Sequence, residues 1–356
     1  MNISIIIPVY NVEPYIERCL NSIMNQTFTD GVECIIVNDC SPDKSLEIAQ
    51  HLINQYKGNI LFRIISHDKN QGVAVARNTG LKAAQGEYII QIDSDDYCEL
   101  DMLEDMYKNA CENDSDIVIA DYFSQYKNHA TYISQPVLPH NKTDLIKEFL
   151  CGNIKPFLWN KLIRNELYRK NNITFKNNIN YGEDYLIELY LFYYAKKISH
   201  ICKAYVHYVQ YNVNSYSKIV NRKSLEDMVL YEQNIMKFFT EKKLYAEYKK
   251  EISFVRTNIF FYLIYRSSGN LQKRWLSYYK DLSVKDIIHS NKWWGIYWKM
   301  AAIFALYNML PVYNLMRNFW RLLNSNKAKS IPLYSKQSRY IKSYTHDKTF
   351  NYFTCI

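Results

Sequence analysis

Three acidic residues stand close together after an apolar run that ends at Ile92: Asp93, Asp95 and Asp96. Carboxylates this close raise one another's pKa values unless they share a cation. Mg²⁺ and Mn²⁺ prefer such hard oxygen ligands, and they commonly take one or two protein carboxylates beside water and phosphate oxygens. The acids therefore indicate a site for a metal-bound diphosphate, while a cap for the helix expected near Leu100 is the structural alternative.

Five apolar runs precede the polar turns of this half of the chain, and each has the length of a buried strand. They cover residues 3–8, 34–37, 61–66, 88–92 and 116–120, and amphipathic helices are expected between them, one of them capped by Ser41. The alternation predicts an α/β fold with right-handed βαβ units and a mostly parallel sheet. Because ligands bind beyond the carboxyl ends of such strands, Tyr10, Asp39 and the turn of residues 93–96 should meet in one crevice.

Four motifs follow one another along the first third of the chain. They are IIIPVYN at residues 5–11, VNDCS at 37–41, NQG at 70–72 with ARNTG at 76–80, and DSDD at 93–96. Their order and spacing resemble glycosyltransferase family 2 over about residues 1–125. Two further motifs, WNKL at 159–162 and GEDY at 182–185, resemble the acceptor half of that family. The resemblance implies a Rossmann-like GT-A fold and a sugar transfer from a nucleoside-diphosphate donor with inversion.

The resemblance also implies roles for individual donor-site residues. Asp39 would accept the uracil N3–H of a UDP-linked donor, Asp93 would lie near the ribose and the metal, and Asp95 would be the ligand of Mn²⁺ or Mg²⁺. The donor-binding set is completed by Pro8, Tyr10, Arg77 and Ser94. The guanidinium of Arg77 can neutralise part of a diphosphate's charge, or it can form a structural ion pair instead. Cys40 stands where the family often has glycine.

The acceptor half contains the residue expected to take the proton from the attacking hydroxyl. In family 2 this is the Asp of the Glu-Asp pair, here Asp184. Glu183 is the rival, and because neighbours on a helix point about 100° apart, only one of the two side chains can face the acceptor. Acids in the first turn of a helix are also favoured by the helix dipole alone. Trp159 could stack on an acceptor sugar or belong to the core, and His207 could be a further metal ligand or be structural.

Beyond about residue 225 the apolar residues recur at helical spacing, and the sequence becomes basic. Residues 271–342 contain 13 Lys and Arg against two Asp, so the net charge of +9 lies in this part of the chain. A tryptophan-rich stretch at residues 293–298 beside basic residues is typical of a helix on an anionic membrane surface, and the apolar stretch that follows is too short to span a bilayer. A packed helical appendage or a dimer contact is the alternative. No nucleic-acid-binding motif is present, so nucleic acid is not an expected partner.

These patterns predict four parts of the chain. The GT-A catalytic domain would cover residues 1–220, with a donor half at 1–125 and an acceptor half at 126–220. A helical extension (221–290), a basic amphipathic membrane-surface segment (291–342) and a tail (343–356) would follow. Eight scattered cysteines without metal-ligand spacing, and an apolar N-terminal strand in place of a signal peptide, favour a cytoplasmic protein peripheral to the inner face of the cytoplasmic membrane.

We therefore expect a glycosyltransferase that moves a sugar to a saccharide or a polyprenyl-linked acceptor. By the family resemblance, the donor is UDP-linked and the product belongs to capsule, O-antigen or exopolysaccharide synthesis. One alternative is a catalytically silent scaffold that binds nucleotide sugars at the membrane. The other is a nucleotidyltransferase on a similar sheet, but the glycine-rich phosphate loop expected after its first strand is absent.

Overall fold

A computed structural model of the chain describes residues 1–139, 141–213, 215, 220–289 and 295–330, with side chains as far as residue 323. It divides into two compact units, Met1–Tyr231 and the part that begins at Glu232, and the division falls inside helix α8 (Arg222–Glu241). The domain boundary predicted at residue 220 lies just before α8, and the one predicted at residue 290 falls outside the described residues.

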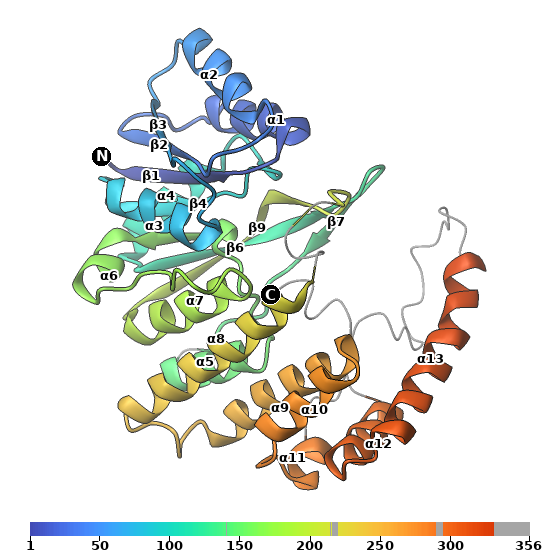
Figure 1. The fold of residues 1–356 in the computed structure, drawn as a ribbon. Coiled ribbons are helices and arrows are strands. Elements are labelled where there is room, and N and C mark those ends of the chain that lie inside the picture. Colours follow the sequence, from blue (N-terminus) through green and yellow to red (C-terminus); the bar gives the residue numbers. More distant parts are fainter. Residues whose placement is uncertain (140, 214, 216–219, 290–294, 331–356) are drawn as a thin grey trace. The chain divides into compact units, whose positions relative to one another are not determined.

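Within the described residues, the first unit contains a nine-stranded sheet in the order β3-β2-β1-β4-β8-β6-β9-β5, with β7 paired to β6 (Figure 1). The strands are β1 (Ile3–Val9), β2 (Val32–Asn38), β3 (Leu61–Ser66), β4 (Tyr88–Gln91), β5 (Tyr97–Cys98), β6 (Ile117–Gln125), β7 (Ala130–Ile133), β8 (Lys161–Arg164) and β9 (Ile198–Val209). The five predicted strands correspond to β1, β2, β3, β4 and β6. The predicted α/β fold class is therefore confirmed.

The sheet is parallel in one half and mixed in the other. β3, β2, β1 and β4 run parallel to one another. Beyond β4, β8 is antiparallel to both β4 and β6, β7 is antiparallel to β6, and β5 is antiparallel to β9, while β6 and β9 are parallel. β8 begins with Lys161 and ends with Arg164, and β9 contains His200 and Lys203, so neither forms the apolar run that revealed the other strands. The predicted parallel arrangement thus describes the donor half.

Helices pack against this sheet and cover its core. They are α1 (Glu13–Met24), α2 (Ser45–Gln55), α3 (Val73–Ala83), α4 (Met102–Asn113), α5 (Lys142–Leu150), α6 (Asn165–Lys170) and α7 (Glu183–Tyr194), with a short 3₁₀ turn at Leu158–Asn160. β2 and β4 are buried along their whole length, and α3 packs on β1 and β2. The close approach of α3 depends on Gly80, because a Cβ there would lie 2.3 Å from Ile6 Cγ2 of β1.

The loops after β1 and β2 are tied together by side chains that cap helices. Asp43 accepts hydrogen bonds from the backbone N–H of Glu13 at the start of α1 (2.7 Å) and of Ser45 at the start of α2 (3.1 Å). Ser41 does not cap α2 as predicted, because the loop continues to Ser45 before the helix begins. Its Oγ instead accepts a hydrogen bond from the backbone N–H of Asn11 at 2.8 Å. The carboxyl ends of β1 and β2 are therefore held in a fixed relation.

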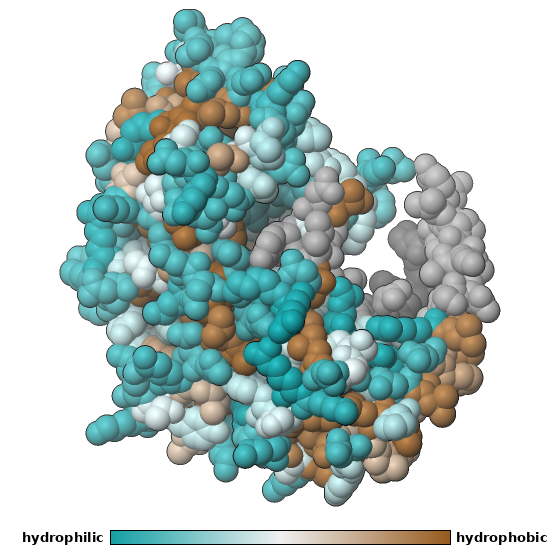
Figure 2. Space-filling model, in the orientation of Figure 1, coloured by the Kyte–Doolittle hydropathy of each residue, from teal (hydrophilic) through white to brown (hydrophobic). Residues whose placement is uncertain are grey.

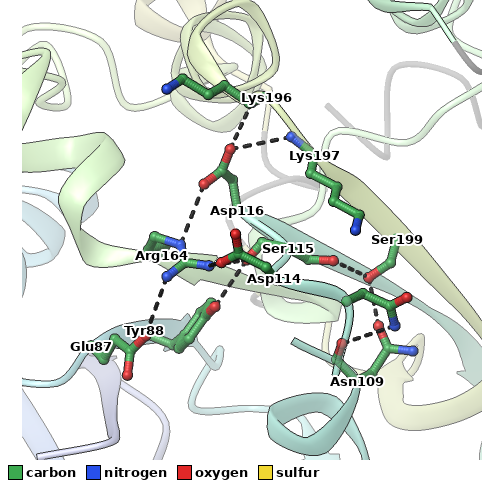
Figure 3. Close-up of polar contacts among 11 residues, drawn as sticks. Glu87, Tyr88, Asn109, Asp114, Ser115, Asp116, Arg164, Lys196, Lys197 and Ser199 are labelled. Atoms are coloured by element: carbon green, nitrogen blue, oxygen red, sulfur yellow. Dashed lines mark hydrogen bonds and ion pairs between the residues drawn. The ribbon is translucent and has the colours of Figure 1, made fainter. Parts of the chain in front are cut away.

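An ionic cluster fixes the opposite, amino ends of the strands (Figure 3). Arg164, at the end of β8, forms ion pairs with Glu87 (3.2 Å), Asp114 (2.6 Å) and Asp116 (3.3 Å). Asp116 also accepts a hydrogen bond from the backbone N–H of Lys196 at 2.6 Å, just before β9. We call Arg164 and its three acids the amino-end cluster. It joins the ends of the neighbouring strands β4, β8, β6 and β9.

The second unit is helical throughout its described residues. Beyond the end of α8 it contains α9 (Lys249–Arg266), α10 (Asn270–Tyr278), α11 (Val284–His289), α12 (Ile296–Leu306) and α13 (Leu310–Ser330). Arg317 fixes α13 to α9, because its buried guanidinium donates hydrogen bonds to backbone oxygens at the end of α9, including that of Ser267 at 2.5 Å. Trp298 is buried between the rings of Tyr265 and Trp320. Over the described ranges, no helix combines the length and apolarity needed to cross a bilayer.

Candidate active site

Asp39, buried directly after β2, holds the loop between β3 and α3. Its carboxylate accepts hydrogen bonds from the backbone N–H groups of Gln71 (2.9 Å) and Gly72 (2.8 Å), and His67 Nδ1 lies 2.7 Å from Oδ1. A carboxylate has about four lone-pair positions, so these contacts leave about one for a ligand N–H. The next residue, Cys40, has φ +56, in the left-handed region that favours glycine. This geometry accounts for the glycine that the family often has here.

Arg77 joins the two halves of the predicted site. It is buried on α3, and its Nη2 lies 2.8 Å from Asp93 Oδ1 in the turn after β4. Its Nη1 lies 3.0 Å from Glu183 Oε1 and also contacts Asp184, both in the first turn of α7. We call these four residues the carboxyl-end cluster. It brings Arg77 together with acids of the acceptor motif that are 106 and 107 residues away in the chain. Of the two predicted roles for Arg77, the structure shows the ion pair.

The starts of α3 and α7 are positioned against each other by Asn180. Its side-chain oxygen accepts a hydrogen bond from the backbone N–H of Ala74 at 3.2 Å, while its own backbone N–H donates to Asp227 of α8 at 3.0 Å. Gly72 and Gly182 precede the two helices with φ values of +92 and +84, which a side chain would strain. These turns set the relative position of Arg77 and the two acids of α7.

Burial is the main influence on the titration of the two acids of α7. It raises the pKa of Asp184 to about 6, although Arg77 acts in the opposite direction, and the nearby Asp93 raises it further. The pKa of Glu183 is raised well above its usual range, first by burial and then by repulsion from Asp184. Since Glu183 holds its proton more tightly, Asp184 is the member of the pair that is ionised near neutral pH.

The three acids of the DSDD turn point to different partners. Asp93 belongs to the carboxyl-end cluster, and Asp95 Oδ2 accepts a hydrogen bond from Asn212 Nδ2 at 2.7 Å. Asp96 is fully buried and accepts a hydrogen bond from the backbone N–H of Val209 at 2.7 Å, and burial raises its pKa well above the usual range. Repulsion from Asp95 and Asp93 raises this pKa further, as expected for acids this close together. Asp96 therefore serves the structure of the turn.

The residues present fit a cation that is held mainly by a ligand. Among the described side chains, no group of three or more His, Cys, Asp or Glu lies close enough to hold a metal ion by itself. Mg²⁺ commonly binds through one or two carboxylates together with substrate phosphate oxygens and water, which requires no such group. Asp95 is half-buried and supplies a hard oxygen of the kind that Mg²⁺ and Mn²⁺ prefer.

His207, predicted as a further metal ligand, has protein partners on both ring nitrogens. Nδ1 lies 3.0 Å from Gln125 Oε1, and Nε2 lies 2.7 Å from Glu99 Oε1. The ring is stacked between Tyr97 and Phe123, with centroid distances of 4.3 and 4.6 Å. Because each nitrogen has a protein partner at hydrogen-bond distance, neither is open to a metal in this arrangement. We therefore leave His207 out of the proposed site.

Trp159, predicted to contact the acceptor, is buried in an aromatic cluster. Its ring stacks on Phe157 at a centroid distance of 4.6 Å and on Tyr208 at 5.3 Å, and it meets Tyr122 edge-on at 5.0 Å. A ring covered on these sides presents little surface to a sugar. The structure thus favours the core role that the sequence left open.

The remaining predicted donor residues lie at strand ends. Pro8 belongs to β1, Tyr10 follows it and is exposed, and Ser94 is buried in the DSDD turn. Arg18 of α1 was not predicted, because one basic residue in an amphipathic helix carries no sequence signal. It donates a hydrogen bond to the backbone oxygen of Asp95 at 3.2 Å, so it supports this turn.

Comparisons with known proteins agree with this arrangement. The family model described as Glycosyl transferase family 2 matches residues 4–178. The chain is 34% identical over 257 residues to a protein of Bacillus subtilis (strain 168) named as glycosyltransferase EpsH, covering 70% of this chain and 72% of that protein. It is 32% identical over 214 residues to the poly(ribitol-phosphate) beta-N-acetylglucosaminyltransferase TarP of Staphylococcus aureus (strain N315), covering 59% of this chain and 63% of TarP.

The fold is also similar to a solved structure. The crystal structure of S. aureus TarS 1–349 in complex with UDP-GlcNAc aligns with a TM-score of 0.66 and 23% sequence identity, covering 90% of this chain and 92% of that one. At this identity the likeness concerns the fold, and it extends beyond the residues that the family model matches. Taken with the similarity to EpsH and the converging motifs, these findings show that the chain is a glycosyltransferase and belongs to glycosyl transferase family 2.

Proposed function

We propose that the enzyme transfers a sugar from a UDP-linked donor to a hydroxyl of a saccharide or lipid-linked saccharide, with inversion. The observation that carries the proposal is the carboxyl-end cluster, in which Arg77 joins the donor-side Asp93 to the acceptor-side Asp184. Donor and acceptor must meet within bonding distance for a single displacement. A cluster that spans both motifs is the arrangement that such a reaction requires.

Asp184 is the proposed general base. It would take the proton of the attacking hydroxyl while the bond between the sugar and the diphosphate breaks. Its pKa of about 6 suits this role, because the group is ionised at neutral pH yet basic enough to accept a proton. Glu183 is the weaker candidate, since burial and repulsion from Asp184 favour its protonated form. Arg77 would hold Asp184 in place and limit the rise of its pKa.

The proposed donor site lies between Asp39 and Asp95. Asp39 would accept the imide N–H of uracil through the lone-pair position that its contacts with the loop leave unused. Tyr10 would lie nearby at the end of β1. Asp95 would hold Mn²⁺ or Mg²⁺, and a bound cation would stabilise the charge of the leaving diphosphate. Support for a UDP-linked donor comes from TarS, whose crystal structure of similar fold is a complex with UDP-GlcNAc.

The proposed product is a cell-surface polysaccharide. TarP is named for transfer to poly(ribitol-phosphate), and another relative, 36% identical over 204 residues, is the poly(ribitol-phosphate) beta-glucosyltransferase of Bacillus spizizenii. Because these names differ in the transferred sugar, we extend to this chain only the acceptor class. The sugar itself has to be identified by experiment.

A thermal-shift screen tests the donor proposal. Full-length protein is heated with UDP, GDP, CDP and a panel of their sugar conjugates, each with Mn²⁺ and with EDTA. A ligand at 100 times its Kd adds about 2.7 kcal/mol of stability, which gives a clear shift of the melting temperature. We expect shifts with UDP compounds and Mn²⁺. Stabilisation by GDP or CDP compounds alone would contradict the assignment of Asp39 to uracil.

We also propose that the second unit binds an anionic membrane surface, which would hold the enzyme near lipid-linked acceptors. Leu315, Phe319 and Leu322 are exposed and lie along one side of α13, while Arg317 is buried on another side. Figure 2 shows apolar surface in brown over α12 and α13. Basic residues in the same part of the chain add attraction to anionic lipid. The tryptophan-rich stretch at residues 293–298 was predicted to lie on the membrane. Trp298 is buried and therefore does not serve as a membrane anchor, while Trp293 and Trp294 lie outside the described residues.

Flotation with liposomes tests the membrane proposal. The full-length protein should float with anionic liposomes at low salt, less at high salt, and little with neutral liposomes. The variant Phe319→Asp/Leu322→Asp should lose most of this binding. Val137→Asp, which changes an exposed apolar residue of the first unit, is the matched control and should float like the unaltered protein. Absence of flotation at low salt would favour a packed helical appendage.

A further inference from the structure

The lysine of the WNKL motif is buried without solvent contact, close to the proposed base. Lys161 Nζ donates hydrogen bonds to the backbone oxygens of Phe157 (2.7 Å) and Lys155 (3.0 Å) and to Asn160 Oδ1 (3.1 Å), and it lies 3.2 Å from Glu188 Oε2. The side chains of Lys161 and Glu188 are each 1% exposed. An ammonium group has three protons to donate, and four oxygens surround this one. The site is therefore built to hold a charged lysine.

Helix α7 and strand β8 place Lys161 and Glu188 close to Asp184, the proposed base. Glu188 lies four residues after Asp184 on α7, and residues at this spacing share one face of a helix. β8 runs antiparallel to β4 with Tyr88 opposite Arg164, so Lys161, at the other end of β8, lies at the carboxyl end of β4. The turn with Asp93 follows β4 at that same end. The lysine is thus held behind the carboxyl-end cluster, on the side of the protein interior.

The charges of this site act on Asp184. The Lys161 ammonium lowers the pKa of Asp184, and Asp184 in turn favours the charged form of Lys161. Burial lowers the pKa of Lys161 from its usual value, while Glu188 and Asp184 oppose this shift, and burial raises the pKa of Glu188 to about 8. The titratable groups that face Asp184 are Arg77 on α3, Asp93 after β4, Lys161 on β8, Tyr168 on α6, and Glu183 and Glu188 on α7.

We propose that Lys161 is a positioning residue for the base: its buried ammonium, held by backbone oxygens, Asn160 and Glu188, keeps Asp184 ionised at the pH at which the enzyme works. This inference rests on the proposed role of Asp184. Two cations of the described residues, Arg77 and Lys161, then stabilise the ionised form of Asp184. Arg77 contacts Asp184 directly, and Lys161 acts on it through the protein interior, where a low dielectric strengthens the interaction.

The test measures the titration of Asp184 directly and needs no substrate. Full-length protein is labelled with ¹³C at the Asp carboxyl carbons, the Asp184 signal is assigned from Asp184→Asn, and its shift is followed between about pH 5 and pH 8. Lys161→Met should raise the pKa of Asp184 by roughly one unit, because an attractive charge is lost. Lys170→Met is the matched control, since Lys170 pairs with Glu166 on the surface of α6, and it should leave the titration unchanged.

Two further variants separate charge from packing. Glu188→Gln keeps an oxygen near Lys161 and should change the pKa of Asp184 by less than half as much as Lys161→Met. The double variant Lys161→Met/Glu188→Gln leaves no buried charge at this site, so it should fold even if Lys161→Met does not, and it should again raise the pKa. A folded Lys161→Met protein, or a folded double variant, with an unshifted Asp184 would overturn the proposal. So would an equal shift in Glu188→Gln.

Turnover provides a second reading. For the UDP-sugar that the wild type hydrolyses or transfers, Lys161→Met should lose activity at about pH 6 and recover most of it at about pH 8, with KM little changed. A structural defect would lower activity at both pH values. If the wild type turns over no nucleotide sugar while the titration behaves as described, the proposed function fails and the electrostatic role of Lys161 stands.

Discussion

Two arginines of the first unit each hold three carboxylates, at opposite ends of the same strands. Arg77 holds Asp93, Glu183 and Asp184 beyond the carboxyl end of β4. Arg164 holds Glu87, Asp114 and Asp116 at the amino ends of β4 and β6 (Figure 3). The two clusters have the same composition, one Arg with two Asp and one Glu. What separates them is their exposure to water.

The side chain of Arg77 is 4% exposed and those of its acids are at most 30% exposed. In the amino-end cluster, Arg164 is 18% exposed and the side chain of Asp114 is 90% exposed. Water screens the pairs of Arg164 with Asp114 and Glu87, whereas Asp116 is 18% exposed, and all three pairs act as ties between strand ends. In the first cluster one cation faces three acids with little water, and burial shifts their protonation. The comparison teaches that burial, rather than the choice of residues, turns an ionic cluster into a candidate for acid–base chemistry.

The largest expected difference comes from removing each arginine. Arg77→Met leaves buried carboxylates without their cation, which should cost about 3–5 kcal/mol of stability and reduce turnover by orders of magnitude. Arg164→Met should cost about 1 kcal/mol and leave turnover near the wild-type value. Urea unfolding and a donor-turnover assay on both variants measure this. Equal losses of activity would show that the two clusters are both structural.

Removing one acid should also affect UDP binding differently at the two ends of the strands. Asp95→Ala should abolish the Mn²⁺-dependent part of UDP binding, because the diphosphate would lose the cation that neutralises it. Asp114→Ala, at the amino ends, should bind UDP like the wild type. Calorimetry with Mn²⁺ and with EDTA provides the comparison. If Asp95→Ala and the wild type bind UDP equally under both conditions, Asp95 is not the metal ligand.

The pH dependence should be opposite for activity and for stability. As pH rises through about 6, Asp184 loses its proton and turnover should increase. The folded-state pKa of this carboxyl lies above its unfolded value, so its contribution to stability is complete below about pH 4 and is lost as pH rises through about 6, amounting to about 2–3 kcal/mol. Asp184→Asn should lack this part of the stability profile. Denaturant unfolding of the wild type and of Asp184→Asn at several pH values measures this. Identical stability profiles for the two proteins would contradict the prediction.

The sequence predicted the donor half of the fold well because β1, β2, β3, β4 and β6 are continuous apolar runs between helices. It missed β8 and β9, whose polar residues hide them, and with them the antiparallel half of the sheet. Ser41 was predicted as a helix cap from its type and its position before Pro42, but Asp43 takes that role because the loop is longer. Such choices depend on the path of the loop, which local preference does not determine.

The candidate site was predicted in parts. Asp39, Asp93 and Asp184 carry motif signals, whereas the contact of Arg77 with Asp184 depends on packing between residues 107 positions apart. Trp159 and His207 were open between two roles because an aromatic or a lone histidine looks the same in sequence whether it packs or binds. Lys161 and Glu188 were missed as a pair, since nothing in the sequence shows that they are buried together.

The central claim is that Asp184 of the carboxyl-end cluster is the base of the transfer. The most direct test compares wild type, Asp184→Asn and Asp114→Asn in donor turnover and in UDP affinity. The account predicts that Asp184→Asn keeps its fold and its UDP affinity and loses about 10²–10⁴-fold in turnover, since an amide cannot accept the hydroxyl proton. Asp114→Asn should behave like the wild type. An active Asp184→Asn enzyme, above all beside an inactive Glu183→Gln, would contradict the claim.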